Sequence, residues 1–283
     1  MQKTAIYTSS HLRTTPGTAC VAEAISAALN RLGVEHRELE NTNDYWCRDY
    51  MPVMLSDDGI YAKYRYNPDY LADYRTNHKY ITEQEAACRG LDILAPTDLE
   101  IVFDGGNYVR CGDKVIMTDK IFMENPEWTP YGLLSHLTEK LHAEIILLPW
   151  DMCDKCGHSD GMVLPLNSDT LLLNSCWKNN DKKFHRRLMK ILEPHFNILE
   201  PVYGCKEEKY SWCYLNCLKL RDALLLPTLS ENSDCDNDIA AVETFGHLFP
   251  QSEIIPIYSK PLIKKGGALH CVTWEFIKKD TTQ

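Results

Sequence analysis

The sequence has no long apolar run, no excess of basic residues and no low-complexity segment. Its longest apolar run, Ile145–Trp150, is far shorter than the roughly 20 residues of a membrane-spanning helix, so we expect no membrane contact. Lys and Arg number 30 against 40 Asp and Glu, and the formal net charge of −10 disfavours nucleic acid as a partner. The first residues, MQKTAIYTSS, lack the apolar stretch of a signal peptide, which predicts a cytoplasmic protein.

The chain also has no Gly/Ser-rich or Pro-rich linker, although it contains 14 glycines and 14 prolines. With 283 residues, 44% of them hydrophobic, it is long enough for a large core, and we predict one catalytic domain over residues 1–283. Twelve cysteines are spread along its length. In a long chain without a leader they indicate reduced, mostly buried thiols rather than a disulfide framework.

Helix-like periodicity returns at intervals, separated by short β-branched or aromatic runs. It predicts a short helix over Thr82–Arg89 and longer ones over Cys20–Leu32, Tyr131–His142, Lys183–Leu192 and Asp236–Leu248. Strands are predicted over Thr4–Tyr7, Gly59–Tyr66, Ile101–Phe103, Lys114–Thr118, Glu144–Leu148, Thr170–Asn174, Ala223–Leu226 and Glu253–Ile257, with hairpins around 111–113 and 167–169. A unit of hairpin, helix and strand thus recurs about every 50–60 residues, which predicts one α/β domain of about five units around a centre.

Four short stretches combine reactive side chains with glycines or aromatic residues. They are 43–52 (NDYWCRDYMP), 103–108 (FDGGNY), 156–164 (CGHSDGMVL) and 265–273 (KGGALHCVT). In the third stretch His158 and Asp160 are two residues apart, so on a strand both side chains would point to one face and form an acid/base pair. A surface His–Asp pair without function would have the same spacing.

The last of these stretches places Gly266 and Gly267 shortly before His270 and Cys271. Paired glycines allow the backbone to approach a ligand closely, and Cys is a competent nucleophile near neutral pH. Cys271 is therefore the candidate nucleophile. A buried structural thiol is the alternative for any one of the twelve cysteines.

The first two stretches contain side chains suited to a planar cation. Trp46 stands three residues before Asp49, and an aromatic face with a carboxylate can bind a guanidinium through cation–π contact and bidentate hydrogen bonds. A structural Trp beside a turn at 48–49 would explain this pattern equally well. The segment 104–107, Asp-Gly-Gly-Asn, is typical of a tight turn, which needs no function.

Taken together and in this order, the four stretches resemble the motifs of the guanidine-modifying superfamily, in particular those of the agmatine deiminase / Porphyromonas-type peptidylarginine deiminase family. The W-x-R-D, E/D-G-G-N, G-H-x-D and G-G-x-x-H-C motifs of that family stand here at 46–49, 104–107, 157–160 and 266–271. Tyr214-Leu215-Asn216 is similar to a further family segment. The resemblance spans Asp44–Thr273 and implies a five-fold pseudosymmetric α/β propeller (pentein), in agreement with the repeated unit.

The resemblance implies a deiminase that needs no cofactor and acts on a small cationic guanidine. Agmatine is the expected substrate, with N-carbamoylputrescine and ammonia as products. Cys271 would attack the guanidinium carbon. His158 would protonate the departing amine and then activate water to hydrolyse the covalent thiouronium intermediate.

The resemblance also assigns the carboxylates. Asp49 and Asp160 would hold the guanidinium nitrogens, and Asp104 would orient His158 from a position where most relatives carry the longer Glu. Further substrate contacts would come from Trp46, Asn107 and Gly267. Two carboxylates without a bound cation should raise the pKa of the Cys271 thiol, so we expect substrate binding to promote thiolate formation.

Several alternatives stay open. Cys153-x-x-Cys156 beside His158 has the spacing of a zinc half-site, which Cys111, Cys176 or Cys205 would have to complete. The same fold could instead transfer the amidine group to an amine, or serve as a non-catalytic guanidine-binding protein. Free or substituted arginine is the alternative substrate, and its carboxylate would need a cation in the pocket. The sequence leaves the oligomeric state open, a homo-oligomer included.

Overall fold

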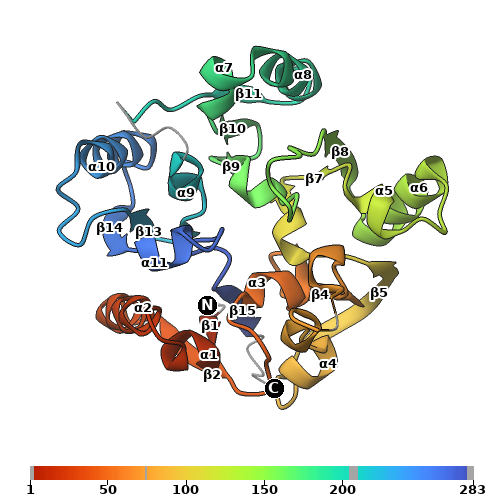
Figure 1. Ribbon diagram of the computed structural model, residues 1–283, viewed down its shortest axis with the longest axis horizontal. Helices are drawn as coiled ribbons and strands as arrows, with labels where there is room; N and C mark the ends of the chain where they lie inside the picture. The colour runs from red at the N-terminus through yellow and green to blue at the C-terminus, as the bar shows by residue number, and fades with distance from the viewer. Residues whose placement is uncertain (1–2, 74, 204–209, 279–283) are drawn as a thin grey trace.

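The computed structural model describes residues 3–73, 75–203 and 210–278. Five three-stranded sheets lie around a common centre, and the longer helices lie on the outside of the ring (Figure 1). The strand orders are β15-β1-β2, β3-β4-β5, β6-β7-β8, β9-β10-β11 and β12-β13-β14. In every sheet the middle strand pairs antiparallel with the first strand and parallel with the last.

The strands are short. They are β1 (Lys3–Ser9), β2 (Glu35–Leu39), β3 (Val53–Ser56), β4 (Ile60–Arg65), β5 (Leu94–Val102), β6 (Val109–Cys111), β7 (Lys114–Thr118), β8 (Glu144–Leu148), β9 (Val163–Pro165), β10 (Thr170–Leu173), β11 (Asn197–Leu199), β12 (Leu218–Lys219), β13 (Ala223–Thr228), β14 (Glu253–Tyr258) and β15 (Trp274–Lys278).

The helices are of two kinds, crossover helices within a unit and very short helices between units. The α-helices are α1 (Ser10–Thr14), α2 (Ala19–Arg31), α3 (Cys47–Tyr50), α4 (Gln84–Ala87), α5 (Ile121–Glu124), α6 (Pro130–Leu141), α7 (Cys176–Asn180), α8 (Lys182–Leu192), α9 (Trp212–Leu215), α10 (Asp236–Leu248) and α11 (Lys260–Ile263). The 3-10 helices are η1 (Asp69–Leu71), η2 (His78–Tyr80), η3 (Gly105–Asn107) and η4 (Ser159–Gly161).

Helix α6 shows why the crossovers form where they do. The Thr129 hydroxyl accepts a hydrogen bond from the Gly132 N–H at 3.1 Å, and Pro130 occupies the first turn, where its missing N–H costs nothing. Leu133, Leu137 and Leu141 recur every four residues and are fully buried. One face of the helix therefore packs on its sheet while the other faces outward.

The ring is closed by strands from opposite ends of the chain. β15 pairs antiparallel with β1, with Ala5 opposite Phe276 and Tyr7 opposite Trp274. These side chains are buried, and Trp274 donates a hydrogen bond from its indole N–H to the Pro52 carbonyl at 2.8 Å. The last strand thus completes the first sheet and also fastens it to the connection ahead of β3.

Most of the predicted elements are confirmed. The four longer helices appear as α2, α6, α8 and α10, within one or two residues of the predicted bounds, and both hairpins form. The helix predicted over Thr82–Arg89 is reduced to α4, a single turn. The strand predicted over Ile101–Phe103 is only the end of β5, whose earlier residues alternate in burial and include Pro96. The first part of β5 was not predicted because its exposed and partly buried residues lack the apolar run that marked the other strands.

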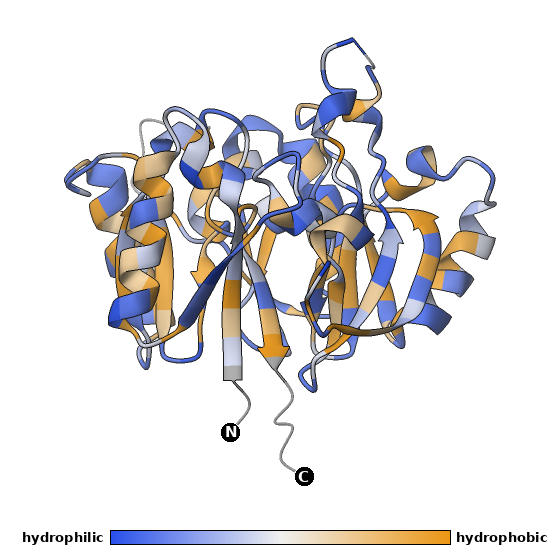
Figure 2. Ribbon diagram, turned by 90° about the horizontal axis from the view of Figure 1, so that it is seen from below, coloured by the Kyte–Doolittle hydropathy of each residue, from blue (hydrophilic) through white to orange (hydrophobic). Residues whose placement is uncertain are grey.

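Hydrophobic residues gather in the strands and on the inner faces of the helices, while the connecting loops are mainly hydrophilic (Figure 2). Four buried clusters fill the spaces between sheets and helices. In the three described ranges, every helix is too short or too polar to cross a bilayer.

Candidate active site

The reactive side chains lie on the connections between units. α3 carries Asp49, η3 begins after Asp104, η4 contains Asp160, α9 ends at Asn216, and Cys271 precedes β15. One connection of each of the five units therefore contributes to the same place. A pocket of about 320 Å³ opens there, and its lining includes His158, Asp160, Asn216 and Cys271.

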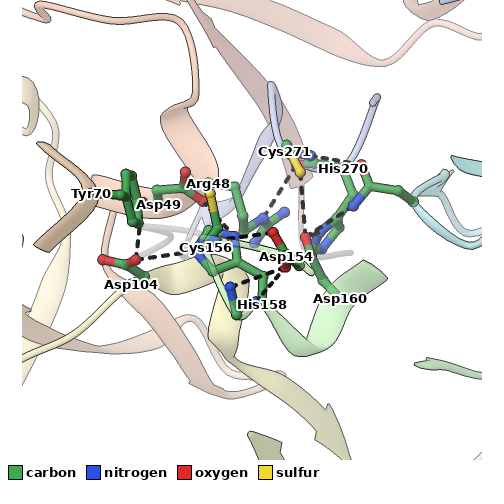
Figure 3. Close-up of polar contacts among 12 residues, drawn as sticks. Arg48, Asp49, Tyr70, Asp104, Asp154, Cys156, His158, Asp160, His270 and Cys271 are labelled. Carbon is green, nitrogen blue, oxygen red and sulfur yellow. Dashed lines mark hydrogen bonds and ion pairs between the residues drawn. The ribbon is translucent and has the colours of Figure 1, made fainter. Parts of the chain in front are cut away.

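On one side of this pocket, a single carboxylate oxygen gathers three donors. Asp160 Oδ2 accepts from His270 Nδ1 at 2.7 Å and from Asn216 Nδ2 at 3.1 Å. The Cys271 thiol donates to the same oxygen, with Sγ 3.6 Å away (Figure 3). Asp160, Asn216 and Cys271 are buried and His270 is partly buried, and the nucleophile candidate is thereby held against a carboxylate.

Asn216 ties this carboxylate to the backbone around the nucleophile. Its Oδ1 accepts the N–H groups of Ala268 at 3.1 Å and Cys271 at 3.2 Å, while its Nδ2 donates to Asp160. The Cys271 carbonyl in turn accepts the backbone N–H of Arg48 at 3.1 Å. The loop before β15 is therefore held by two different units.

On the opposite side, His158 lies between two carboxylates. Its Nε2 is 3.1 Å from Asp104 Oδ2 and its Nδ1 is 3.8 Å from Asp49 Oδ1. Asp104 thus reaches His158 although it is one methylene shorter than Glu. Gly106 lies against the same ring, and a Cβ at that position would collide with His158 Nδ1 and crowd Asp49 Oδ1, so only glycine fits.

The expectation that His158 and Asp160 share one face of a strand is wrong. The segment is a turn that leads into η4, with Gly157 at φ +65°. The Asp154 carboxylate accepts the backbone N–H groups of Cys156, Gly157 and His158, which favours the turn over an extended strand. The two side chains consequently find different partners, Asp104 for His158 and His270 for Asp160.

The electrostatics keep the thiol protonated when no cation is bound. Burial raises the pKa of Cys271 well above its usual value, and the carboxylates of Asp160 and Asp49 raise it further. The pKa of Asp49 is also well above the ordinary range, mainly because the carboxyl is buried and near Asp104 and Asp160.

His158 and Asp160 shift toward their charged forms. Burial lowers the pKa of His158, but the carboxylates of Asp49 and Asp104 outweigh it and raise the pKa to about 10. Burial would raise the pKa of Asp160, but the His270 hydrogen bond and the nearby charges of His270, His158 and Arg48 together outweigh burial, and the net pKa is lowered. The pocket at neutral pH therefore contains an imidazolium and a thiol, the state expected of a general acid beside an unactivated nucleophile.

The remaining predicted substrate contacts lie farther from the reactive atoms. Asn107 Oδ1 accepts the N–H of Thr118 at 2.7 Å, so its carboxamide oxygen anchors η3 to β7. The Trp46 ring covers Gly267 so closely that a Cβ there would collide with it. Of the predicted site residues, Cys271, His158 and Asp160 line the pocket, whereas Trp46, Asp49, Asp104, Asn107 and Gly267 are not among its lining residues.

Three cysteines besides Cys271 lie at the pocket. Cys153 is exposed, Cys156 and Cys176 are half-buried, and all three line the pocket. Within the described ranges, no group of three or more His, Cys, Asp or Glu side chains is arranged to hold a metal ion. Cys205, one candidate fourth ligand of the zinc alternative, lies outside the described residues.

Three side chains of the site were given no role from the sequence. His270 and Asn216 stand inside recognised motifs, but their contacts with Asp160 depend on how distant connections meet. Tyr70, whose hydroxyl donates to Asp104 Oδ2 at 3.0 Å, comes from η1 in the crossover between β4 and β5. Nothing in its local sequence marks it.

Five α/β units surround a pocket lined by Cys271, His158 and Asp160, and two further buried carboxyl groups, those of Asp49 and Asp104, lie against the His158 imidazole. The family model described as Porphyromonas-type peptidyl-arginine deiminase matches residues 9–276, and the chain belongs to this family.

Solved structures agree in fold. The chain is similar to the agmatine deiminase of C. jejuni, with a TM-score of 0.73 and 16% identity over 98% of this chain and 94% of that one. It is also similar to the agmatine deiminase of Enterococcus faecalis, with a TM-score of 0.70 and 17% identity over 98% and 93% of the two chains. At such low identity the likeness establishes the fold.

Proposed function

We propose that this protein is a cysteine-dependent deiminase that hydrolyses the guanidinium group of a small cationic substrate. The observation that carries the proposal is that Cys271, His158 and Asp160 line one pocket, with the carboxyl groups of Asp49 and Asp104 against the His158 imidazole. A thiol, an imidazolium and three carboxylates suit a substrate that is cationic, planar and rich in N–H donors.

The carboxylates explain how a guanidinium would be held. Asp49 Oδ1 is buried, and no described residue donates a hydrogen bond to it. An unpaired buried acceptor is costly, and a guanidinium N–H would remove that cost. Asp160, across the pocket beside Cys271, would take other N–H groups of the same cation. Two fixed carboxylates would thus place the guanidinium carbon near the sulfur, mainly a proximity contribution.

The chemistry then follows in two steps. The Cys271 thiolate forms a bond to the guanidinium carbon, and the His158 imidazolium gives its proton to the departing nitrogen, which leaves as ammonia. The neutral imidazole next takes a proton from water, the hydroxide adds to the covalent thiouronium, and the carbon–sulfur bond breaks. The protonated ureido group that results loses its extra proton to solvent, and the products are a neutral ureido compound and the regenerated thiolate.

Substrate charge would activate the nucleophile. The pKa of Cys271 is raised by burial, Asp160 and Asp49, so the free thiol stays protonated at pH 7. A guanidinium between these carboxylates offsets their negative charge and lowers the pKa of the thiol. The thiolate would therefore form when a cation is present and water is displaced.

The outer part of the pocket favours agmatine over arginine. Asp151 and Asp154 line it, and among the described lining residues there is no Lys or Arg. Trp177 Nε1 donates to Asp151 Oδ2 at 2.9 Å, which fixes one of these carboxylates at the wall. Such a lining attracts the second cationic end of agmatine, whereas the carboxylate of arginine would find no partner. The expected product is N-carbamoylputrescine.

We also infer that the five units are related by pseudo-five-fold symmetry, as in the predicted α/β propeller. The identical strand order and pairing of the five sheets supports this. The cytoplasmic location and the oligomeric state stay predictions.

Ammonia release tests the function. Purified protein is assayed with agmatine, arginine, methylated arginine and a blocked arginine peptide, beside Cys271→Ala and the matched control Cys20→Ala, which changes an exposed thiol. We expect release from agmatine, its loss in Cys271→Ala by roughly 10⁴-fold or more, and no change in Cys20→Ala.

Other outcomes would contradict the proposal. If none of the four compounds releases ammonia but one of them binds tightly, the protein would be an amidinotransferase or a guanidine-binding protein. Transfer would then appear as a new amidino compound when an amine is supplied. Activity that survives Cys271→Ala would remove the cysteine from the mechanism.

A further inference from the structure

One oxygen of Asp104 has two partners and the other has none. Asp104 Oδ2 is 3.1 Å from His158 Nε2 and accepts the Tyr70 hydroxyl at 3.0 Å (Figure 3). Asp104 Oδ1 is buried, with no hydrogen-bond partner in the described part of the chain. Asp104 is 1% exposed, so its carboxyl group is shielded from bulk solvent. Tyr70 and His158 therefore share a single acceptor atom.

We propose that Tyr70 is a positioning residue for His158 that acts through Asp104: its hydroxyl limits how strongly the Asp104 carboxylate holds the His158 proton. The inference rests on the proposed function only where it treats that proton as the one given to the leaving group. A hydrogen bond to a carboxylate stabilises its charge, and a second donor on the same oxygen weakens the interaction with the first.

The crossover that carries Tyr70 is firmly fixed at this point. The neighbouring Asp69 carboxylate pairs with Lys120 Nζ at 2.8 Å, and Lys120 also pairs with Glu124 at 2.8 Å. Lys120 Nζ lies 4.9 Å from the centre of the Tyr70 ring, on its face. The Tyr70 ring in turn meets the His158 ring edge-on, with centroids 6.2 Å apart. Tyr70 is thus held by its ring and free to direct its hydroxyl at Asp104.

Tyr70 acts as a donor over the whole working range of pH. Burial raises the pKa of its hydroxyl well above the usual value, and the nearby charge of Asp104 raises it further. The hydroxyl therefore stays protonated while His158 titrates. A phenolate, which would accept rather than donate, does not form near neutral pH.

The charged and titratable groups around this chain of contacts come from several elements. His158 interacts with Asp49, Asp104, Asp160 and His270. Tyr70 is influenced by Tyr66, Asp49 and Cys156, besides Asp104 and Lys120. Asp104 also interacts with Lys120 and Glu124. Tyr70 differs from all of them because its neutral hydroxyl donates a hydrogen bond to the atom that contacts His158.

The test measures the protonation of His158 directly, without substrate, by NMR. The protein carries 13C-labelled histidine, and the imidazole carbon chemical shift of His158 is followed against pH. The signal is assigned by its loss in His158→Gln. Because Asp49 is the largest of the influences that raise the His158 pKa, the comparison is made in Asp49→Asn, where the midpoint moves down from about 10 into a convenient range. Tyr70→Phe keeps the ring and removes the hydroxyl. Tyr214→Phe is the matched control, since Tyr214 donates to Asp238 Oδ1 at 2.9 Å in another unit.

We expect Tyr70→Phe to raise the midpoint of His158 by about one pH unit and Tyr214→Phe to leave it unchanged. No shift, a downward shift, or equal shifts in the two variants would overturn the proposal. In protein with Asp49 intact, the alkaline limb of kcat/KM should move up with Tyr70→Phe. Because the titration needs no turnover, it still decides the role of Tyr70 if the substrate panel is silent.

Discussion

The two sides of the pocket differ in how completely their polar atoms are paired. On the Cys271 side, Asp160 Oδ2 has three donors and Asn216 uses both ends of its carboxamide. On the His158 side, Asp49 Oδ1 and Asp104 Oδ1 are buried without a hydrogen-bond partner among the described residues. Burial is similar on both sides, so the difference lies in the supply of donors.

This difference separates the placing of the thiol from the binding of the cation. The paired side, that of Cys271, is preorganised, because its hydrogen bonds fix the loop that carries the proposed nucleophile before any substrate arrives. On the unpaired side, that of His158, two buried carboxyl oxygens have no hydrogen-bond donor among the described residues, which costs free energy until substrate N–H groups reach them. Part of the binding free energy of a guanidinium would therefore come from relief of this cost. The substitutions that follow test each side separately.

His158→Gln should have the largest effect, since it removes the acid from the unpaired side. We expect kcat to fall by roughly 10³-fold, within the usual range for loss of a general acid/base. The measurement is ammonia release at saturating agmatine, and circular dichroism checks that the fold is kept. If both sides contributed only to binding, KM would rise and kcat would stay near its original value.

Asp49→Asn should move two readouts in opposite directions. It removes a guanidinium partner, so kcat/KM should fall by about 10²-fold. It also removes a charge that raises the pKa of Cys271, so iodoacetamide should alkylate the free thiol faster at pH 8. Asp222→Asn, at an exposed position, is the matched control and should change neither. Slower alkylation in Asp49→Asn would contradict the electrostatic account of the thiol.

Asn216→Ala should have the smallest effect on rate and a clear effect on stability. It leaves the N–H groups of Ala268 and Cys271 without their acceptor, at a cost of about 2 kcal/mol in the free energy of unfolding. We expect kcat to fall about 10-fold because the nucleophile is less well placed. Urea denaturation and steady-state kinetics measure the two effects.

Asn216→Asp sharpens this test. It keeps an acceptor for the two N–H groups but replaces the donor to Asp160 with a second carboxyl. Stability should recover relative to Asn216→Ala while activity stays low. If both variants behaved like the original protein, the paired side would not depend on Asn216, and the contrast between the two sides would be lost.

The sequence predicted the outer ring better than the centre. Helices α2, α6, α8 and α10 are long enough to show a period, and β7 and β8 were located to the residue. The connections at the centre are too short for any period, and their shape depends on tertiary contacts. The turn at His158 is an example. The Asp154 side chain organises this turn, whereas the spacing of His158 and Asp160 led to the prediction of a strand.

The site was predictable as a set of residues but not as a set of contacts. The motifs that resemble the family brought Cys271, His158 and the three aspartates into one proposal. In the structure Cys271, His158 and Asp160 line one pocket, and Asp49 and Asp104 contact His158. Their pairing needed the structure, since His270 rather than His158 is the partner of Asp160. Tyr70 could not be found from the sequence, because a single tyrosine in a crossover carries no pattern.

The pairing of β15 with β1 has a consequence for folding during synthesis. Cys271 lies three residues before β15, and β15 pairs with β1, more than 260 positions earlier in the chain. During synthesis four sheets can assemble while the fifth still lacks β15. The proposed nucleophile therefore reaches its partners only when the ring closes, and a reactive thiol beside Asp160 becomes a mark of ring closure.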